Sequence, residues 1–389
     1  MILTVALCLL LAVAAIPFVY YLLALFSTLR FFQLAAKLSI RDSSHTPPLS
    51  CLKPVKGLDP EAYENFASYC RQDYPDYEIV FCVDPADPAF PVIEKLIRDF
   101  PGSRIRVLFG PGHDAINDKV ARLTRLVSEA RHEVVVISDA DVRVAPDYLR
   151  TVVAPLSNPN VGGTTCFYTS IHEKTLPEKL QSISMISDFF PSILVAWRLD
   201  GVKFALGQTI ATTRTRLAGF GGYQALESRP ADDLLVGRLI AEQGCEMRFL
   251  PYVLQTVSDF QSIRDFTDKR LRWMTEMRFM RPWGHFGLLF TQGLAWSLVA
   301  VAAHPTAAIT LAYLGTYFAL RAAMAVTLGS WGLKQKGIWK KLPLIPCWDA
   351  MAFMIWLASF ARRSMRWRGA DYYIRKGMLV PVAPPSAEK

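Results

Sequence analysis

The chain has 389 residues, of which 52% are hydrophobic, and a formal net charge of +9 at pH 7. This apolar content is too high for an ordinary soluble enzyme, so membrane segments have to be located first. The basic excess suits nucleic acid, anionic lipid or a phosphate-rich substrate, and does not choose among them. Seven scattered cysteines without a CxxC pair and six histidines without an HExxH pattern argue against a disulfide framework or a zinc site. They indicate a reducing compartment.

Residues 1–28 are predicted to form an N-terminal transmembrane anchor. Ile2 to Phe26 is almost unbroken apolar sequence, which is long enough to cross a bilayer. The motif AVAA at residues 12–15 resembles a signal cleavage site, but the apolar run continues past it and no positive charge precedes it. Arg30, Lys37 and Arg41 follow, so the positive-inside rule places the next part of the chain in the cytoplasm.

Residues 45–260 are predicted to form a cytoplasmic α/β domain. Strand-like runs at 49–55, 78–84, 104–110 and 133–139 alternate with helix-like stretches at 60–71, 88–100 and 116–131. Continuous apolar strands in such an alternation are typical of a mainly parallel sheet that is flanked by helices on both faces. The ligands of these sheets bind beyond the carboxyl ends of the strands.

Residues 261–284 are predicted to form an amphipathic helix at the membrane interface. Ile263–Trp283 interleaves aromatic, Leu and Met residues with Arg and Lys, and it contains the sequence KRLRW. A basic amphipathic helix of this kind suits an anionic bilayer surface. The alternative is a cytosolic helix that packs its apolar side on the protein core.

Residues 285–362 are predicted to contain three membrane segments, at about 286–303, 307–328 and 342–360, and residues 363–389 a basic tail. His304-Pro305 separates the first two segments, which suggests a tight hairpin. Arg321 lies inside the second segment, where its charge is costly unless it snorkels or pairs. Basic residues flank the third segment on both sides, so its sequence leaves open whether it crosses the membrane.

Three acidic clusters follow the predicted elements: Asp84, the pair Asp139 and Asp141, and Asp232-Asp233. Each alone could cap a turn or a helix. Asp84 and Asp139 both stand at strand ends, which suggests a common site. Because residues i and i+2 of an extended chain point the same way, Asp139 and Asp141 would repel each other. This repulsion is relieved if a cation, usually a metal ion, lies between the two carboxylates, or if both reach water.

The order of these elements resembles membrane glycosyltransferases with the GT-A fold, whose signature is three separated aspartates followed by (Q/R)xxRW. The resemblance is closest to the ceramide glucosyltransferase family (family 21, similar to family 2), including bacterial members. It runs from about residue 47 to 283. It rests on LKPVKG (52–57), INDKVARL (116–123), ISDADVRV (137–144), ADDLL (231–235) and KRLRW (269–273). It implies a GT-A sheet together with α-helical transmembrane segments.

The resemblance also implies a role for each matched residue. Asp84 would contact the nucleoside and Lys119 the diphosphate. Asp139 and Asp141 would hold Mg²⁺ or Mn²⁺, and Asp233 would be the catalytic base. Arg272 and Trp273 would close over the diphosphate and the acceptor. Asp232 and Lys269 also fall at substrate-binding positions of the motifs. Lys269 replaces the Gln or Arg of the family, so it keeps a charge but lacks the planar fork of arginine.

The function implied is that of an inverting glycosyltransferase that moves glucose from UDP-glucose to the primary hydroxyl of ceramide. We expect a multi-pass protein of a bacterial inner membrane whose catalytic domain faces the cytoplasm, with a UDP-sugar and a lipid as substrates. Neither nucleic acid nor a protein partner is predicted. One alternative is transfer of N-acetylglucosamine or another hexose to a hopanoid or other lipid. The other is a non-catalytic scaffold that binds anionic lipid, which leaves the convergence of the carboxylates unexplained.

Overall fold

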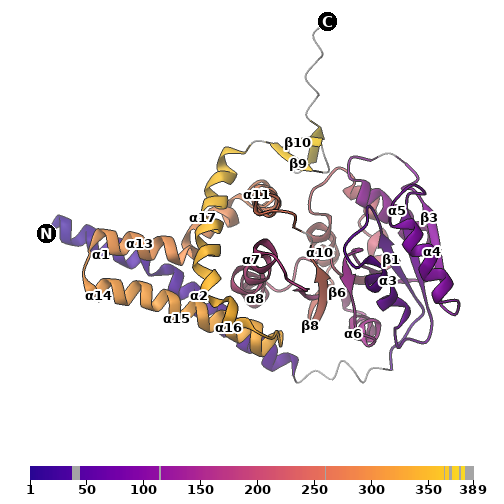
Figure 1. The fold of residues 1–389 in the computed structure, drawn as a ribbon, viewed down its shortest axis with the longest axis horizontal. Helices are drawn as coiled ribbons and strands as arrows, with labels where there is room; N and C mark the ends of the chain where they lie inside the picture. The colour runs from indigo at the N-terminus through magenta and orange to yellow at the C-terminus, as the bar shows by residue number, and fades with distance from the viewer. Residues whose placement is uncertain are drawn as a thin grey trace, which may run out of the picture. The chain divides into compact units, whose positions relative to one another are not determined.

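The computed structural model describes residues 1–36, 44–113, 115–258, 260–362, 364–367, 370–375 and 378–381. Lys37, Arg41 and much of the predicted basic tail lie outside these residues. The chain forms two compact units (Figure 1). We call Ala35–Glu173 with Asp200–Asp259 the sheet unit, and Met1–Leu34, Lys174–Leu199 and Phe260–Lys389 the helical unit.

The sheet unit contains an eight-stranded sheet in the order β3-β2-β1-β4-β7-β6-β8-β5. Its strands are β1 (Leu49–Pro54), β2 (Tyr77–Val83), β3 (Ile105–Phe109), β4 (Val134–Ile137), β5 (Val142–Arg143), β6 (Val161–Ile171), β7 (Ile210–Thr213) and β8 (Glu246–Val257). The first four strands pair in parallel, whereas β7 is antiparallel to both β4 and β6. The predicted strands and the mainly parallel α/β fold are therefore confirmed.

Helices flank this sheet, as the alternating sequence predicts. They are α3 (Ala62–Cys70), α4 (Phe90–Asp99), α5 (Asp118–Glu129), α6 (Tyr148–Val153), α9 (Arg214–Ala218) and α10 (Asp232–Glu242), with the short helices η1 (Ala154–Ser157) and η3 (Tyr223–Leu226). The side chain of Asn117 begins α5 by accepting a hydrogen bond from the Val120 amide at 3.3 Å.

The arrangement of β1 and β4 determines where a ligand can bind. In the order β3-β2-β1-β4, chain connections leave β1 and β4 toward opposite sides, which makes this the switch point of the sheet. Both strands are fully buried along their length, so only their ends reach solvent. A crevice at the carboxyl ends of β1 and β4 is therefore the expected binding site.

Gly237 allows α10 to approach the backbone that precedes β7. A methyl group at position 237 would lie 2.1 Å from the carbonyl carbon of Phe204 and 2.2 Å from the Ala205 nitrogen. Any side chain there would push the two segments apart. The glycine thus lets α10 pack against residues 204 and 205, and this contact helps to position the acidic pair Asp232-Asp233 at the start of the helix.

The helical unit is built from long apolar helices and one small sheet (Figure 1). Its elements are α1 (Ile2–Ala14), α2 (Ile16–Ala35), α7 (Leu176–Ser184), η2 (Met185–Phe189), α8 (Phe190–Asp200), α11 (Ile263–Met280), α12 (Pro282–Gly287), η4 (Leu288–Thr291), α13 (Gly293–Ala303), α14 (Ala307–Thr310), η5 (Leu311–Gly315), α15 (Thr316–Ala325), η6 (Val326–Gly332), α16 (Ile338–Lys341), η7 (Leu342–Leu344), α17 (Ile345–Ala361), β9 (Ser364–Trp367), β10 (Ala370–Arg375) and β11 (Met378–Pro381).

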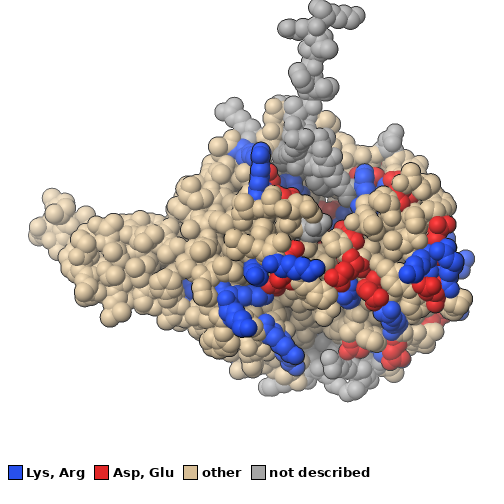
Figure 2. All heavy atoms as spheres, in the orientation of Figure 1, with Lys and Arg blue, Asp and Glu red and all other residues tan. Residues whose placement is uncertain are grey.

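By length and composition, four helices among the described residues could cross a membrane: Ile2–Ala35, Leu176–Asp200, Ala307–Gly332 and Ile338–Ala361. Pro282–Thr291 and Gly293–Ala303 pass the same test as a pair, but they are bent by 53° and form either a broken span or a re-entrant loop. The drawn face of the bundle formed by α1, α13 and α14 carries almost no charged side chains (Figure 2). This surface is typical of a membrane protein.

The segment Leu176–Asp200 was not identified from the sequence as a membrane helix. In the structure, residues 174–199 cluster with the helical unit, although they interrupt the sheet unit in the chain. Val195 packs in one apolar cluster with Tyr21, Tyr317 and Met324. The sequence predicted that the charge of Arg321 would be costly inside a membrane segment unless it was paired. In the structure it is paired, because its Nε donates to Asp349 Oδ2 at 2.8 Å.

Candidate active site

The loop after β4 places Asp139 and Asp141 at the carboxyl edge of the sheet, and a buried lysine lies beneath it. Lys53, at the end of β1, has no exposed surface. Its Nζ donates to the Asp139 carbonyl at 2.8 Å and to Ser138 Oγ at 3.3 Å. It also lies 3.5 Å from the centre of the Tyr69 ring. Burial lowers the pKa of Lys53 to about 8, against the opposing effects of Cys51 and Asp141.

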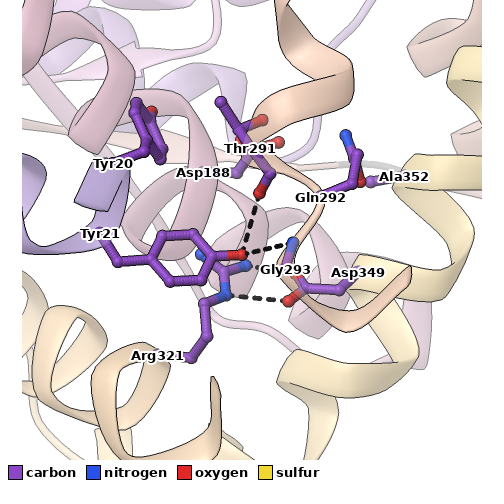
Figure 3. Close-up of a pocket in the computed structure, with 9 residues that line it drawn as sticks. All are labelled: Tyr20, Tyr21, Asp188, Thr291, Gln292, Gly293, Arg321, Asp349 and Ala352. Atoms are coloured by element: carbon purple, nitrogen blue, oxygen red, sulfur yellow. Dashed lines mark hydrogen bonds and ion pairs between the residues drawn. The ribbon is translucent and has the colours of Figure 1, made fainter. Parts of the chain in front are cut away.

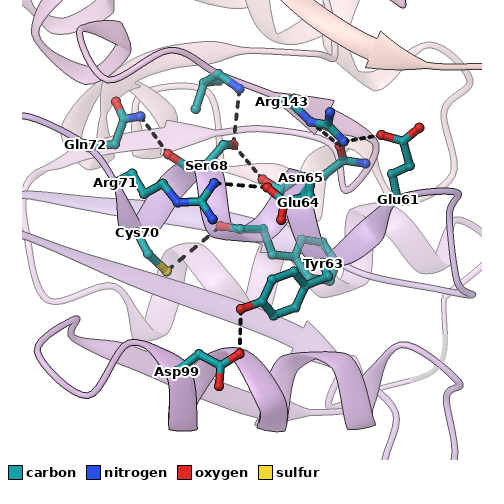
Figure 4. Close-up of polar contacts among 12 residues, drawn as sticks. Glu61, Tyr63, Glu64, Asn65, Ser68, Cys70, Arg71, Gln72, Asp99 and Arg143 are labelled. Carbon is teal, nitrogen blue, oxygen red and sulfur yellow. Dashed lines mark hydrogen bonds and ion pairs between the residues drawn. The ribbon is translucent and has the colours of Figure 1, made fainter. Parts of the chain in front are cut away.

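The other side of this loop is fixed by α3 and the residues before it (Figure 4). Arg143 follows Asp141 by two residues, and its Nη2 contacts Glu61 Oε2 at 2.7 Å and Asn65 Oδ1 at 3.0 Å. The Ser68 hydroxyl accepts a hydrogen bond from the Val144 amide at 3.2 Å. Hydrogen bonds from Arg143 and His172 lower the pKa of Glu61. The aspartates therefore stand on a loop that is anchored on both sides.

Lys119 links two of the predicted acidic clusters. It stands in the first turn of α5, and its Nζ lies 2.7 Å from Asp139 Oδ1 and 3.9 Å from Asp232 Oδ2. Burial alone would lower the pKa of Lys119, but Asp139, Asp232 and Asp233 outweigh it and raise the pKa above its usual range. The lysine is therefore a permanent positive charge between the carboxylates.

Asp233 is held by two backbone amides at the start of α10. Its Oδ1 accepts a hydrogen bond from the Leu234 amide at 2.8 Å, and its Oδ2 accepts one from the Gly207 amide at 2.9 Å. Ala231, just before the acidic pair, has a left-handed backbone with φ of 53°, which is unusual for a residue with a side chain. Burial and the adjacent Asp232 raise the pKa of Asp233 to about 6, although Lys119 opposes this shift.

Gly207 marks the point at which these groups converge. A methyl group at this position would lie 3.1 Å from Asp233 Oδ2, 3.3 Å from Asp139 Oδ2 and 3.5 Å from Lys119 Nζ. Three chemically active groups from three separate elements thus surround one small space next to a glycine. Sequence reasoning missed both Gly207 and Lys53, because Gly207 lies outside the matched motifs and Lys53, although part of LKPVKG, lies inside a strand-like run.

Asp84 lies at the end of β2, in a separate ionic network. Its Oδ2 is 2.5 Å from Nη2 of the buried Arg122, whose Nε also contacts Asp118 Oδ2 at 3.1 Å. The Asp84 side chain remains 42% exposed, so a ligand could still reach it. The structure therefore groups Asp139, Asp232, Asp233 and Lys119 in one cluster and holds Asp84 through Arg122.

The remaining predicted residues lie on α11 in the helical unit. Arg272 Nη1 pairs with Glu276 Oε1 at 2.9 Å. Lys269 Nζ lies 5.6 Å from the centre of the Trp273 ring. Arg270, which was not predicted to have a role, is buried and donates to Gln181 Oε1 at 2.8 Å. The helix thus packs at least one of its basic side chains, Arg270, inside the helical unit.

The donor atoms around Asp139 fit a hard divalent cation only in part. Within the part of the chain that the structure describes, no three His, Cys, Asp or Glu side chains are grouped as a metal site. Asp139 and Asp141 supply carboxylate oxygens, which Mg²⁺ and Mn²⁺ prefer. Such ions commonly complete their coordination with water and substrate phosphates. Two carboxylates at this edge are therefore compatible with a cation that binds together with a diphosphate.

Comparison with known proteins identifies the relatives of this chain. The ceramide glucosyltransferase of Gibberella zeae is 32% identical over 161 residues, which are 39% of this chain and 30% of that protein. The ceramide glucosyltransferase of Komagataella phaffii is 34% identical over 167 residues, or 41% of this chain and 33% of that protein. The alignments thus span about a third of the length of these curated relatives.

A solved structure and a family model also match the chain. The structure titled mannosyltransferase PcManGT from Pyrobaculum calidifontis in complex with GDP-Man and Mn²⁺ is 19% identical and has a TM-score of 0.50. The match covers 89% of this chain and 99% of that one, and it shows a shared fold. The model for Glycosyl transferase family 21 matches residues 9–380, which is nearly the whole sequence. The chain therefore belongs to glycosyl transferase family 21.

Proposed function

We propose that this chain is a membrane-bound inverting glycosyltransferase that transfers glucose from UDP-glucose to the primary hydroxyl of ceramide. The observation that carries the proposal is the convergence of Asp139, Asp233 and Lys119 around Gly207. The membership of family 21 and the ceramide glucosyltransferases among the relatives support the choice of substrates. A lipid-binding scaffold would have no need to hold three carboxylates around one lysine at the carboxyl edge of a sheet.

Asp233 is the proposed general base. The acceptor hydroxyl oxygen would attack the anomeric carbon of glucose while the bond from that carbon to the diphosphate oxygen breaks. The hydroxyl proton passes to Asp233, and UDP leaves with the bonding electron pair. Attack opposite the leaving group inverts the configuration and gives a β-glycoside. A pKa of about 6 leaves Asp233 largely ionised at pH 7 but basic enough to take a proton.

Asp139 and Asp141 would hold a divalent cation, Mg²⁺ or Mn²⁺, which when bound would neutralise the diphosphate and favour its departure. Lys119 would contribute a fixed positive charge to the same diphosphate, in exchange for part of its contact with Asp139. Lys53 holds the Asp139 carbonyl from below and so orients the loop. Asp84 would contact the nucleoside, and Asp232 would keep Lys119 in place.

Arg272, Trp273 and Lys269 are proposed to contact the diphosphate and the acceptor from α11. Arg272 would have to share its guanidinium between Glu276 and the substrate. We also propose that residues 45–260 form the catalytic domain on the cytoplasmic side of a bacterial inner membrane, with residues 1–28 as an anchor. The interfacial helix would extend over 261–284, the C-terminal membrane segments over 285–362 and the basic tail over 363–389.

The proposal is tested by identifying the lipid product. We expect the detergent-purified protein, incubated with UDP-glucose, Mn²⁺ and ceramide, to yield a monohexosylceramide by mass spectrometry, and chelation of the metal to suppress it. Parallel incubations use UDP-N-acetylglucosamine and hopanoid or diacylglycerol acceptors. A product only from UDP-N-acetylglucosamine and hopanoid would replace the proposed substrates, and no product from any pair would support the scaffold.

Gly207→Ala should slow transfer without unfolding the protein. The added methyl would occupy the space between Asp233, Asp139 and Lys119, at contact distances of 3.1 to 3.5 Å. Crowding of this size should lower kcat/KM by about tenfold to a hundredfold. Gly102→Ala is the matched control, because a methyl there meets nothing within 4 Å. Equal activity of the two variants, at equal melting temperature, would contradict the assignment of this space to the reaction.

The pH dependence of transfer should follow Asp233. Its raised pKa means that the base becomes protonated below about pH 6 rather than near pH 4, so kcat should fall about tenfold for each further pH unit. Asp233→Asn should reduce kcat by about 10²- to 10⁴-fold and leave UDP-glucose binding largely intact. Steady-state kinetics and calorimetric titration check both results. Unchanged turnover in Asp233→Asn would refute its role as base.

A further inference from the structure

A polar cavity lies within the helical unit, among helices that are otherwise apolar. Figure 3 shows Arg321 of α15 and Asp349 of α17 beside Tyr21 of α2. Asp188 of η2 and Gln292, at the junction of η4 and α13, line the same cavity. Ionisable side chains are costly at membrane depth and usually mark a functional site. The chemistry assigned to the sheet unit uses none of these groups.

The charge of Arg321 is already neutralised by its neighbours. Its Nε donates to Asp349 Oδ2 at 2.8 Å, and its Nη2 forms a second contact with the same carboxylate. Its Nη1 donates to the Ser187 carbonyl. The Tyr317 hydroxyl donates to Asp349 Oδ2 at 2.7 Å. Arg321 and Asp349 are therefore a satisfied, buried pair, and the cavity has little attraction left for an anion.

Asp188 adds a second carboxylate that this pair does not neutralise. Among the described residues, the structure gives its side chain no hydrogen bond and no ion pair, although it lines the same cavity as Arg321. The cavity therefore holds one positive and two negative side chains. A carboxylate accepts hydrogen bonds only, so a ligand that satisfies Asp188 has to donate them. Hydroxyl and amide N–H groups meet this need without adding negative charge.

A break between two helices lies at the wall of this cavity and leaves backbone groups there without helical hydrogen bonds. The helices Pro282–Thr291 and Gly293–Ala303 bend by 53° at residue 292. The Tyr21 hydroxyl donates to the Thr291 carbonyl at 2.9 Å and accepts a hydrogen bond from the Gly293 amide at 3.0 Å. In membrane proteins, broken helices are tolerated where they are buried or line a cavity, and they often form binding sites. The break therefore lies at the cavity, and Tyr21 pairs the two backbone groups that it frees.

We propose that this cavity binds the secondary hydroxyl or the amide N–H of a neutral lipid, with Asp188 as the acceptor of the hydrogen bond. This inference rests on the proposed function, because it assigns the site to the lipid acceptor of that reaction. Besides the primary hydroxyl that reacts, a ceramide presents a secondary hydroxyl and one amide N–H, which are donors of the kind that Asp188 lacks. An anionic phospholipid would bring a second uncompensated negative charge beside Asp188 and would be excluded.

The test compares Asp188→Asn with Asp200→Asn. Asparagine keeps the size of aspartate but removes the charged acceptor, so the KM for ceramide should rise about tenfold while the KM for UDP-glucose stays the same. Asp200 is the matched control, because its side chain is 70% exposed at the end of α8. Should Asp188→Asn fail to fold, Gln292→Ala, which changes no charge, takes its place in the same assay.

Two further measurements separate lipid binding from transfer. A ceramide with a diazirine near its hydroxyls should cross-link to the full-length wild-type protein without UDP-glucose, and about tenfold more weakly to Asp188→Asn. Phosphatidylglycerol, which is anionic, should not compete with the diazirine ceramide for cross-linking to the wild-type protein. A ceramide with a methylated amide and secondary hydroxyl should bind the two proteins equally, since the donors that reach Asp188 are gone.

The outcomes distinguish the inference from the proposed function. Equal cross-linking and equal KM for ceramide in wild type and Asp188→Asn would overturn the inference and leave the function standing. Cross-linking that depends on Asp188, together with no hexosylceramide product, would refute the function and keep the lipid site. Competition by phosphatidylglycerol would show that the cavity takes an anionic lipid, which also overturns the proposal.

Discussion

The charge balance around Lys119 is the constraint on which the candidate active site depends. Asp139, Asp232 and Asp233 come from two different elements, and Lys119 is the cation that the structure places among them. Keeping three carboxylates ionised so close to a single ammonium group costs free energy, because the carboxylates repel one another. Part of that cost is visible in Asp233, whose pKa is raised to about 6. This excess of negative charge is the physical basis for the proposal that the site binds a divalent cation and takes up a proton.

The scaffold maintains this balance through buried polar contacts. Lys53 supports the Asp139 loop from β1, and Arg143 ties its far side to Glu61 and Asn65. Gly237 lets α10 approach residues 204 and 205, which brings Asp233 to the Gly207 amide. Each contact fixes a carboxylate through another residue, so the geometry of the candidate site is a property of the whole sheet unit. In the helical unit, buried charge is likewise balanced by a partner, because Arg321 and Asp349 neutralise each other.

Much of the sheet unit was predictable, because its signals are local. Apolar runs with turn residues at their ends defined β1 to β4, and the parallel sheet then placed Asp84 and Asp139 at one edge. Asp233 was noticed as part of an acidic pair, but its role, and the choice of Lys119, came only from the resemblance to a family. Their convergence with Asp139 depends on contacts between segments about 20 and 90 residues apart along the chain, which no local pattern encodes.

Other features could not be read from the sequence for definite physical reasons. Lys53 lies inside a strand-like run, where a lysine normally indicates an exposed position rather than a buried support. Leu176–Asp200 contains Asp188 and Arg198, so its mean hydropathy of 1.2 is only moderate and its pattern resembles that of a core helix. The partner of Arg321 stands 28 residues later, in a different helix. Each of these depends on tertiary contacts.

The central claim is that the donor binds and reacts at the cluster of Asp139, Asp233 and Lys119. The most direct measurement is anomalous X-ray diffraction at the manganese edge from crystals grown with Mn²⁺ and UDP. We predict one manganese peak within coordination distance of an Asp139 oxygen, with the diphosphate also in reach of Lys119. Manganese and UDP bound elsewhere, with Asp139 still paired only to Lys119, would contradict it.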